Sequence, residues 1–123
     1  MERATFDDIL RLKLRREALQ TETAEIEIPS LGKTLTFHAP TRDQQLDFID
    51  KARQGGGDIA ASYPAYRQLI YDSCEMLHSD AVQEGNTGDP RDIVDQLFTP
   101  VEAMELGDKI ADRFMTVGKD IKN

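Results

Sequence analysis

Several features that would assign this chain to a specialised class of protein are scarce or missing from its 123 residues. The single cysteine, Cys74, excludes an internal disulfide and a cysteine-based structural zinc cage. No apolar run approaches the roughly 20 residues of a membrane-spanning helix. The first residues place acidic side chains around a short apolar stretch, which is not the pattern of a signal peptide. We therefore expect a protein of the cytoplasm.

Basic residues are also in short supply. The chain has 15 Lys and Arg against 23 Asp and Glu, which gives a net charge of −8 and a pI of about 4.7. An acidic surface repels nucleic-acid phosphates and anionic membranes, so we expect neither as a partner. The imbalance is uneven, because residues 1–20 carry five basic and four acidic side chains and the rest carries ten and nineteen.

The N-terminal segment combines its basic residues with a helical pattern. Thr5 and Asp8 have the spacing of a helix N-terminus, and apolar residues follow with basic residues between them. We predict a helix over residues 6–19, within an N-terminal segment 1–20. Its cationic face either meets an anionic partner or lies in solvent beside an acidic body.

A strand and a helix meet at Pro40. Apolar and polar residues alternate from Leu35 to Ala39, and residues 24–28 alternate in the same way, which predicts a β-hairpin over residues 23–39. Thr41 and Gln44 then have the spacing of a capping box, so we expect a helix over residues 42–54 that packs onto the hairpin. The predicted apolar stripe of this helix consists of Leu46, Ile49 and Ala52, with Phe48 at the margin. We expect Leu46 to contact Phe37.

The predicted ends of the other elements depend on Gly and Pro. Gly55 should end helix 42–54 in the left-handed conformation, and Pro64 should open a helix that runs to Leu77. Residues 78–89 are typical of a loop, after which Asp89 and Pro90 should start a short helix.

The clearest helix start is Thr99, followed by Pro100 and Glu102. We expect this last helix to run to Val117, end at Gly118 and leave residues 119–123 frayed. Its predicted core face includes Gly107, which would permit close approach of another backbone. The whole pattern predicts a small single α+β domain, residues 1–123, with one β-hairpin packed against about five α-helices.

Possible catalytic groups are few. Cys74 and His78 are four residues apart on a predicted helix, as a thiolate–imidazole pair requires, but no third group accompanies them. Aspartates recur at residues 89, 92 and 95 and at residues 47 and 50, where capping and solubility explain them. We therefore predict no catalytic residue, no metal site and no cofactor, and we do not expect an enzyme.

The last helix carries a second apolar stripe, about 110° from the first. Methionines in such a stripe suit an adaptable protein-binding surface. A widened core face is the alternative explanation. The four candidate residues are Val101, Met104, Ala111 and Met115.

Three segments in order resemble one known family. They are a hairpin ending in LTFHAPTRDQQLDFIDKAR, then AYRQLIYDSCEML, then DIVDQLFTPVEAMELGDKI. In this order the segments are similar to the XkdN-like phage tail assembly chaperones, over roughly residues 20–118. The resemblance implies a small non-enzymatic protein of the host bacterial cytoplasm, absent from the mature virion. It also implies binding to the phage tape measure protein and a role in recruiting tail tube subunits; self-association stays open. The alternative is another acidic phage-encoded binding module, such as an inhibitor or a DNA mimic.

Overall fold

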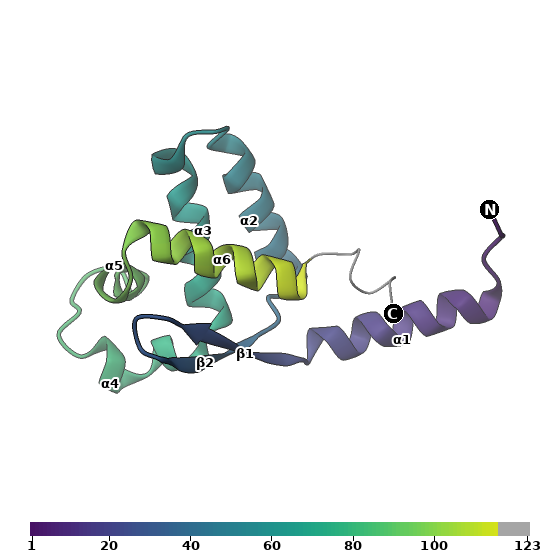
Figure 1. The fold of residues 1–123 in the computed structure, drawn as a ribbon, viewed down its shortest axis with the longest axis horizontal. Helices are drawn as coiled ribbons and strands as arrows, with labels where there is room; N and C mark the ends of the chain where they lie inside the picture. Colours follow the sequence, from purple (N-terminus) through teal and green to yellow (C-terminus); the bar gives the residue numbers. More distant parts are fainter. Residues whose placement is uncertain (116–123) are drawn as a thin grey trace.

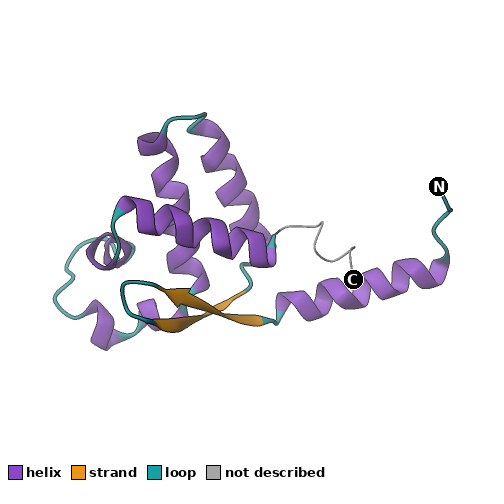
Figure 2. Ribbon diagram, in the orientation of Figure 1, coloured by secondary structure: helices purple, strands orange, loops and turns teal. Residues whose placement is uncertain are grey.

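The computed structural model describes residues 1–115 and shows a small α+β domain with one antiparallel hairpin (Figures 1 and 2). This confirms the predicted fold class. Within the described residues the helices and strands are α1 (Phe6–Gln20), β1 (Thr23–Ile28), β2 (Lys33–His38), α2 (Arg42–Gln54), α3 (Ile59–Ser73), the 3₁₀ helix η1 (Glu75–His78), α4 (Asp80–Gln83), α5 (Asp92–Leu97) and α6 (Pro100–Phe114).

The hairpin has the predicted alternation. β1 pairs with β2 in antiparallel register, with Ala24 opposite Phe37 and Ile26 opposite Leu35. Ile26, Ile28 and Phe37 are buried, while the polar residues between them face outward. Strand pairing stops at His38, before Pro40, which has no N–H to donate.

Helix α3 lies at the centre of the domain. It packs against α2 on one side and against α6 on another, and α5 and η1 also contact it. The hairpin contacts α6 through β1 and η1 through β2. The core therefore forms between α3, α6 and the hairpin, and its largest fully buried side chains include Phe37, Leu69, Ile70 and Ile110.

The prediction for α2 is correct in its bounds and its capping box but wrong in its buried face. Leu46 and Ile49 are 54% and 42% exposed, and neither belongs to the core cluster with Phe37. Phe48 instead packs edge-on against Tyr66 of α3, with the ring centroids 5.4 Å apart. Helix α2 therefore packs on α3 and not on the hairpin, because an aromatic ring buries more area and has a matching ring there.

The connection between α2 and α3 also differs from the prediction. Gly55 has a right-handed φ of −67°, and Gly56 provides the left-handed residue with φ +60°. Gly55 is required for another reason: a Cβ there would lie 2.8 Å from the backbone nitrogen of Ser62. Close packing of the two helix ends explains this glycine.

Helix α3 begins at Ile59, five residues before the predicted start, and contains Pro64 within its length. The side chain of Asp58 accepts a hydrogen bond from the Ala60 N–H and caps the helix. The prediction followed the proline and overlooked this aspartate, which is equally suited to an N-cap. The helix also ends earlier than predicted, at Ser73, and Cys74 follows in extended conformation.

Two predictions between residues 78 and 98 need correction. The expected loop contains one helical turn, α4, which Ser79 caps through the Val82 N–H. Helix α5 begins at Asp92 and not at Pro90, because Pro90 and Arg91 form a turn in which the Asp92 N–H donates to the Asp89 carbonyl. The Asp89 carboxylate accepts from the backbone N–H of Arg91.

Helix α6 has the predicted start and core face. Thr99 and Glu102 form the capping box, and the buried residues are Ala103, Leu106, Gly107, Ile110 and Phe114. The neighbour of Gly107 is a side chain and not a backbone, because a Cβ there would lie 2.4 Å from Cδ1 of Tyr66. The predicted end at Val117 and Gly118 and the predicted frayed residues 119–123 lie outside the described residues.

Helix α1 projects from the rest of the domain as an extension of β1 (Figure 1). The helix starts where predicted, and Thr5 and Asp8 form a capping box there. None of its 15 residues is buried, although Leu19 packs partly against the core.

Candidate functional site

The candidate Cys74–His78 pair is not formed. Cys74 is fully buried, and burial raises the pKa of its thiol, so the reactive thiolate is disfavoured. His78 lies on the following 3₁₀ helix, where its ring stacks on Tyr71 and its Nε2 is 2.7 Å from the Tyr71 carbonyl oxygen. The two residues do not share a helix face, because α3 ends between Ser73 and Cys74.

Each candidate aspartate interacts with another side chain. Asp47 pairs with Lys51 at 3.1 Å, and Asp50 accepts a hydrogen bond from Gln54. Asp89 pairs with Arg91, and this contact lowers the pKa of the carboxyl to about 2. In the described part of the chain, no group of three His, Cys, Asp or Glu residues has the arrangement of a metal site.

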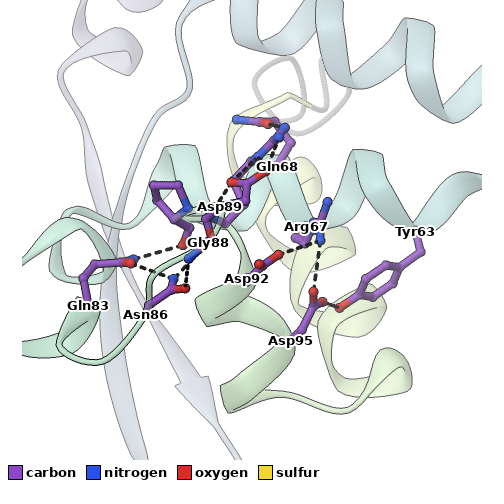
Figure 3. Close-up of polar contacts among 11 residues, drawn as sticks. Tyr63, Arg67, Gln68, Gln83, Asn86, Gly88, Asp89, Asp92 and Asp95 are labelled. Atoms are coloured by element: carbon purple, nitrogen blue, oxygen red, sulfur yellow. Dashed lines mark hydrogen bonds and ion pairs between the residues drawn. The ribbon is translucent and has the colours of Figure 1, made fainter.

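The remaining aspartates join α5 to α3 (Figure 3). Arg67 of α3 contacts Asp92 at 3.3 Å and Asp95 at 3.0 Å, and the Tyr63 hydroxyl donates to Asp95. Burial and this hydrogen bond raise the pKa of Tyr63 to about 12. These contacts connect two helices, so the network positions α5 against α3.

The residues of the predicted binding stripe on α6 differ in burial. Ala111 and Met115 pack against the core, Met104 is half-buried, and Val101 is 67% exposed. The widened core face therefore accounts for the C-terminal half of the stripe. Val101 and Met104 stay candidates for a binding surface at the N-terminal half of α6.

A pocket of about 100 Å³ lies beside this half of α6, between the helix and the hairpin. Its apolar lining comes from three segments, with Ile28 and Pro29 from the hairpin, Phe98 from the end of α5 and Leu106 from α6. Its charged lining consists of Glu27, Glu102, Glu105 and Lys109. Three carboxylates and one amine make the rim acidic.

The positions of the rim groups follow from local structure. Glu102 is held in the capping box of α6, and the hydrogen bond to the backbone of Thr99 lowers the pKa of its carboxyl, with a further contribution from the Ser30 hydroxyl. The hairpin turn is therefore held against the start of α6. Glu27 alternates outward on β1 beside the buried Ile28, and Glu105 is exposed.

A second and shallower hollow continues along β1. It is lined by Ala24, Glu25, Ile26, Glu27, Lys109, Asp112 and Arg113, so it shares Glu27 and Lys109 with the pocket. None of the four predicted binding residues lines the pocket or this hollow, because the lining residues come from segments that are far apart in the chain.

No described helix has the length and apolar character needed to cross a membrane. Comparison of the chain with protein-family models, with curated proteins and with solved structures gave no match.

Proposed function

We propose that the chain is a phage tail assembly chaperone, a non-enzymatic protein that binds the tape measure protein and assists tail tube assembly. One observation supports a binding role most directly: an apolar pocket with an acidic rim opens between the hairpin and α6. The order of the three sequence segments supports the choice of family. Under this proposal the protein acts in the host bacterial cytoplasm and is absent from the mature virion.

The pocket suits one class of binding segment. Its volume of about 100 Å³ has room for a single aliphatic side chain, and Ile28, Phe98 and Leu106 provide an apolar surface for it. Glu27 and Glu105 on the rim favour Lys or Arg beside that side chain. An amphipathic helix with an apolar anchor and basic neighbours meets both conditions, and a long helical tape measure protein offers many such segments.

The test is co-expression with the tape measure protein encoded in the same phage or prophage, with the amount of soluble complex as the measurement. Val101 is exposed and directly precedes Glu102 of the pocket rim, so Val101→Asp should lower the yield of complex about tenfold. Ile59→Asp is the matched control, because Ile59 is 64% exposed but lies at the start of α3. It should leave the yield unchanged.

Two outcomes would contradict the proposal. If the tape measure protein stays insoluble with the wild-type chain, the chaperone function is wrong, and an inhibitor or DNA mimic becomes the better interpretation. If both variants solubilise it as well as the wild type does, the pocket is not the binding site. Gene position gives an independent check, because a chaperone gene should lie just upstream of a very long tape measure gene.

A further inference from the structure

Helix α1 has too little support to be stable on its own. It has 15 residues, none of them buried, and it points away from the domain (Figures 1 and 2). Isolated helices shorter than about 12–15 residues are marginal in water even in favourable sequences, and most helical stability in proteins comes from packing of an apolar face. Helix α1 therefore needs a packing surface beyond the contact of Leu19 with the core.

The helix carries an apolar stripe suited to such packing. At 100° per residue, four residues fall within an arc of about 140°. All four are exposed: Phe6, Ile9, Leu10 and Leu14. Leu12 lies on the opposite side of the helix, and Lys13 interrupts the stripe near its C-terminal end.

The charges of α1 are divided along its length. The acidic residues Asp7 and Asp8 are in the first turn, and the basic residues begin at Arg11. The one acidic residue of α1 beyond them, Glu17, lies 3.9 Å from Lys13. Asp7 and Arg11 are four residues apart, so they flank the same edge of the apolar stripe. Two such helices in antiparallel orientation, centred on residue 9, would place each Asp7 opposite the other copy's Arg11.

We infer that α1 is a dimer interface, in which two copies of the chain pair their α1 helices antiparallel about a two-fold axis. A two-fold interface requires a surface that is complementary to itself, and the division of charge along α1 meets this requirement only in the antiparallel orientation. A parallel pair would place Asp7 opposite Asp7 and Arg11 opposite Arg11.

The charge of the rest of the molecule also favours the antiparallel pair. Residues 21–123 carry ten basic and nineteen acidic side chains, so two such bodies repel each other. Antiparallel helices place the bodies at opposite ends of an interface roughly 22 Å long, well beyond the Debye length of about 8 Å at physiological ionic strength. The repulsion is therefore largely screened.

The dimer should be weak. A pair of 15-residue helices buries less than the roughly 1,200 Å² of a standard stable interface, and Lys13 adds a charged side chain to the stripe. We expect sedimentation of the full chain to show one mass of 13.9 kDa at low micromolar concentration and a rising share of the doubled mass as concentration increases.

A matched pair of variants tests the stripe. Leu10 and Leu12 have similar exposed fractions, 42% and 38%, but face opposite sides of α1. Leu10→Asp should weaken dimerisation at least tenfold, and Leu12→Asp should leave it within about twofold of the wild type. Equal effects of the two variants, or a wild-type chain that stays monomeric at every concentration, would overturn the inference.

A charge exchange tests the orientation. Asp7→Arg should weaken the dimer because it places arginine opposite Arg11, and the double variant Asp7→Arg with Arg11→Asp should restore it. Failure of the double variant to restore dimerisation, with helix content unchanged by circular dichroism, would exclude the antiparallel arrangement. Neither measurement uses the tape measure protein, so this inference and the proposed function can fail independently.

Discussion

At the residue scale, Gly107 shows how a side chain of one helix fixes the composition of another. Glycine usually costs a helix interior roughly 0.5–1 kcal/mol relative to alanine. Here an added Cβ would lie 2.4 Å from the Tyr66 ring, which itself packs against Phe48. Tyr66 thus occupies the space above Gly107, and α2, α3 and α6 are held together through one ring.

Gly107→Ala should therefore destabilise the protein, against the usual helix preference. Overpacking typically costs about 1–3 kcal/mol, which exceeds the gain in helix propensity. Chemical denaturation would measure the change in the free energy of unfolding. Gly56→Ala is the control for a different cause, because alanine there is strained by the positive φ and meets no neighbouring atom. Tyr66→Ser should relieve the Gly107→Ala clash, so additive losses in the double variant would contradict the proposed contact.

Asp89 should make the stability depend on pH. The contact with Arg91 lowers the pKa of Asp89 in the folded protein to about 2, while the unfolded value is near 3.8. The folded state therefore prefers the ionised carboxylate, so its contribution to stability is present above about pH 4 and is lost as the pH falls toward 2.

The variant Asp89→Asn removes this dependence. Its free energy of unfolding should be lower than that of the wild type at pH 6, and the difference should shrink as the pH falls from 4 toward 2. Urea denaturation at several pH values measures the difference. A gap between the two proteins that stays constant over this range would show that the Asp89–Arg91 contact is not maintained in solution.

At the scale of the secondary-structure elements, the hairpin depends on one residue of β2. Phe37 is fully buried and belongs to the core cluster with residues of α3 and α6. Phe37→Ala should cost about 3–5 kcal/mol, a large part of the roughly 5–15 kcal/mol that stabilises a domain. Leu46→Ala, at an exposed position of α2, should change stability by no more than about 0.5 kcal/mol.

Thermal denaturation distinguishes these two variants directly. A large drop in melting temperature for Leu46→Ala would support the predicted contact between Leu46 and Phe37. It would contradict the packing of α2 on α3. A small change for Phe37→Ala would mean that the strand register is shifted by one residue, since such a shift exposes its side chain.

Local signals in the sequence predicted much of the fold. The capping boxes that begin at Thr5, Thr41 and Thr99 are all formed, because both partners of each box lie within four residues. The alternation of the hairpin strands and the core face of α6 were also correct. These features depend on neighbours in the chain and not on the rest of the fold.

Other features depend on contacts between distant segments, and here prediction failed. Helix α2 has two apolar edges, and only the position of Tyr66 on α3 explains why Phe48 is partly buried and Leu46 is exposed. The pocket combines the hairpin, the end of α5 and α6, so no single segment contains its pattern. Val101 belongs to the predicted stripe of α6 but does not line the pocket.

At the scale of the whole molecule, α1 and the rest of the chain should be separable. Removal of residues 1–17 leaves Leu19 in place and deletes no buried side chain. The shortened chain should keep the melting temperature that the full chain shows at low concentration, within a few degrees. Circular dichroism and calorimetry would measure this, and a shortened chain that does not fold would show that α1 contributes to the core.

Pro64 has a consequence for the motions of α3. Proline has no N–H, so the hydrogen bond that would normally reach the carbonyl of Ala60 is missing near the start of this helix. The first turn is held mainly by the Asp58 cap, next to the three glycines 55–57. Amide hydrogen exchange should therefore be graded along α3, with fast exchange around residues 60–63 and slow exchange at Leu69 and Ile70. The central helix of the domain would open from one end while its buried end stays closed.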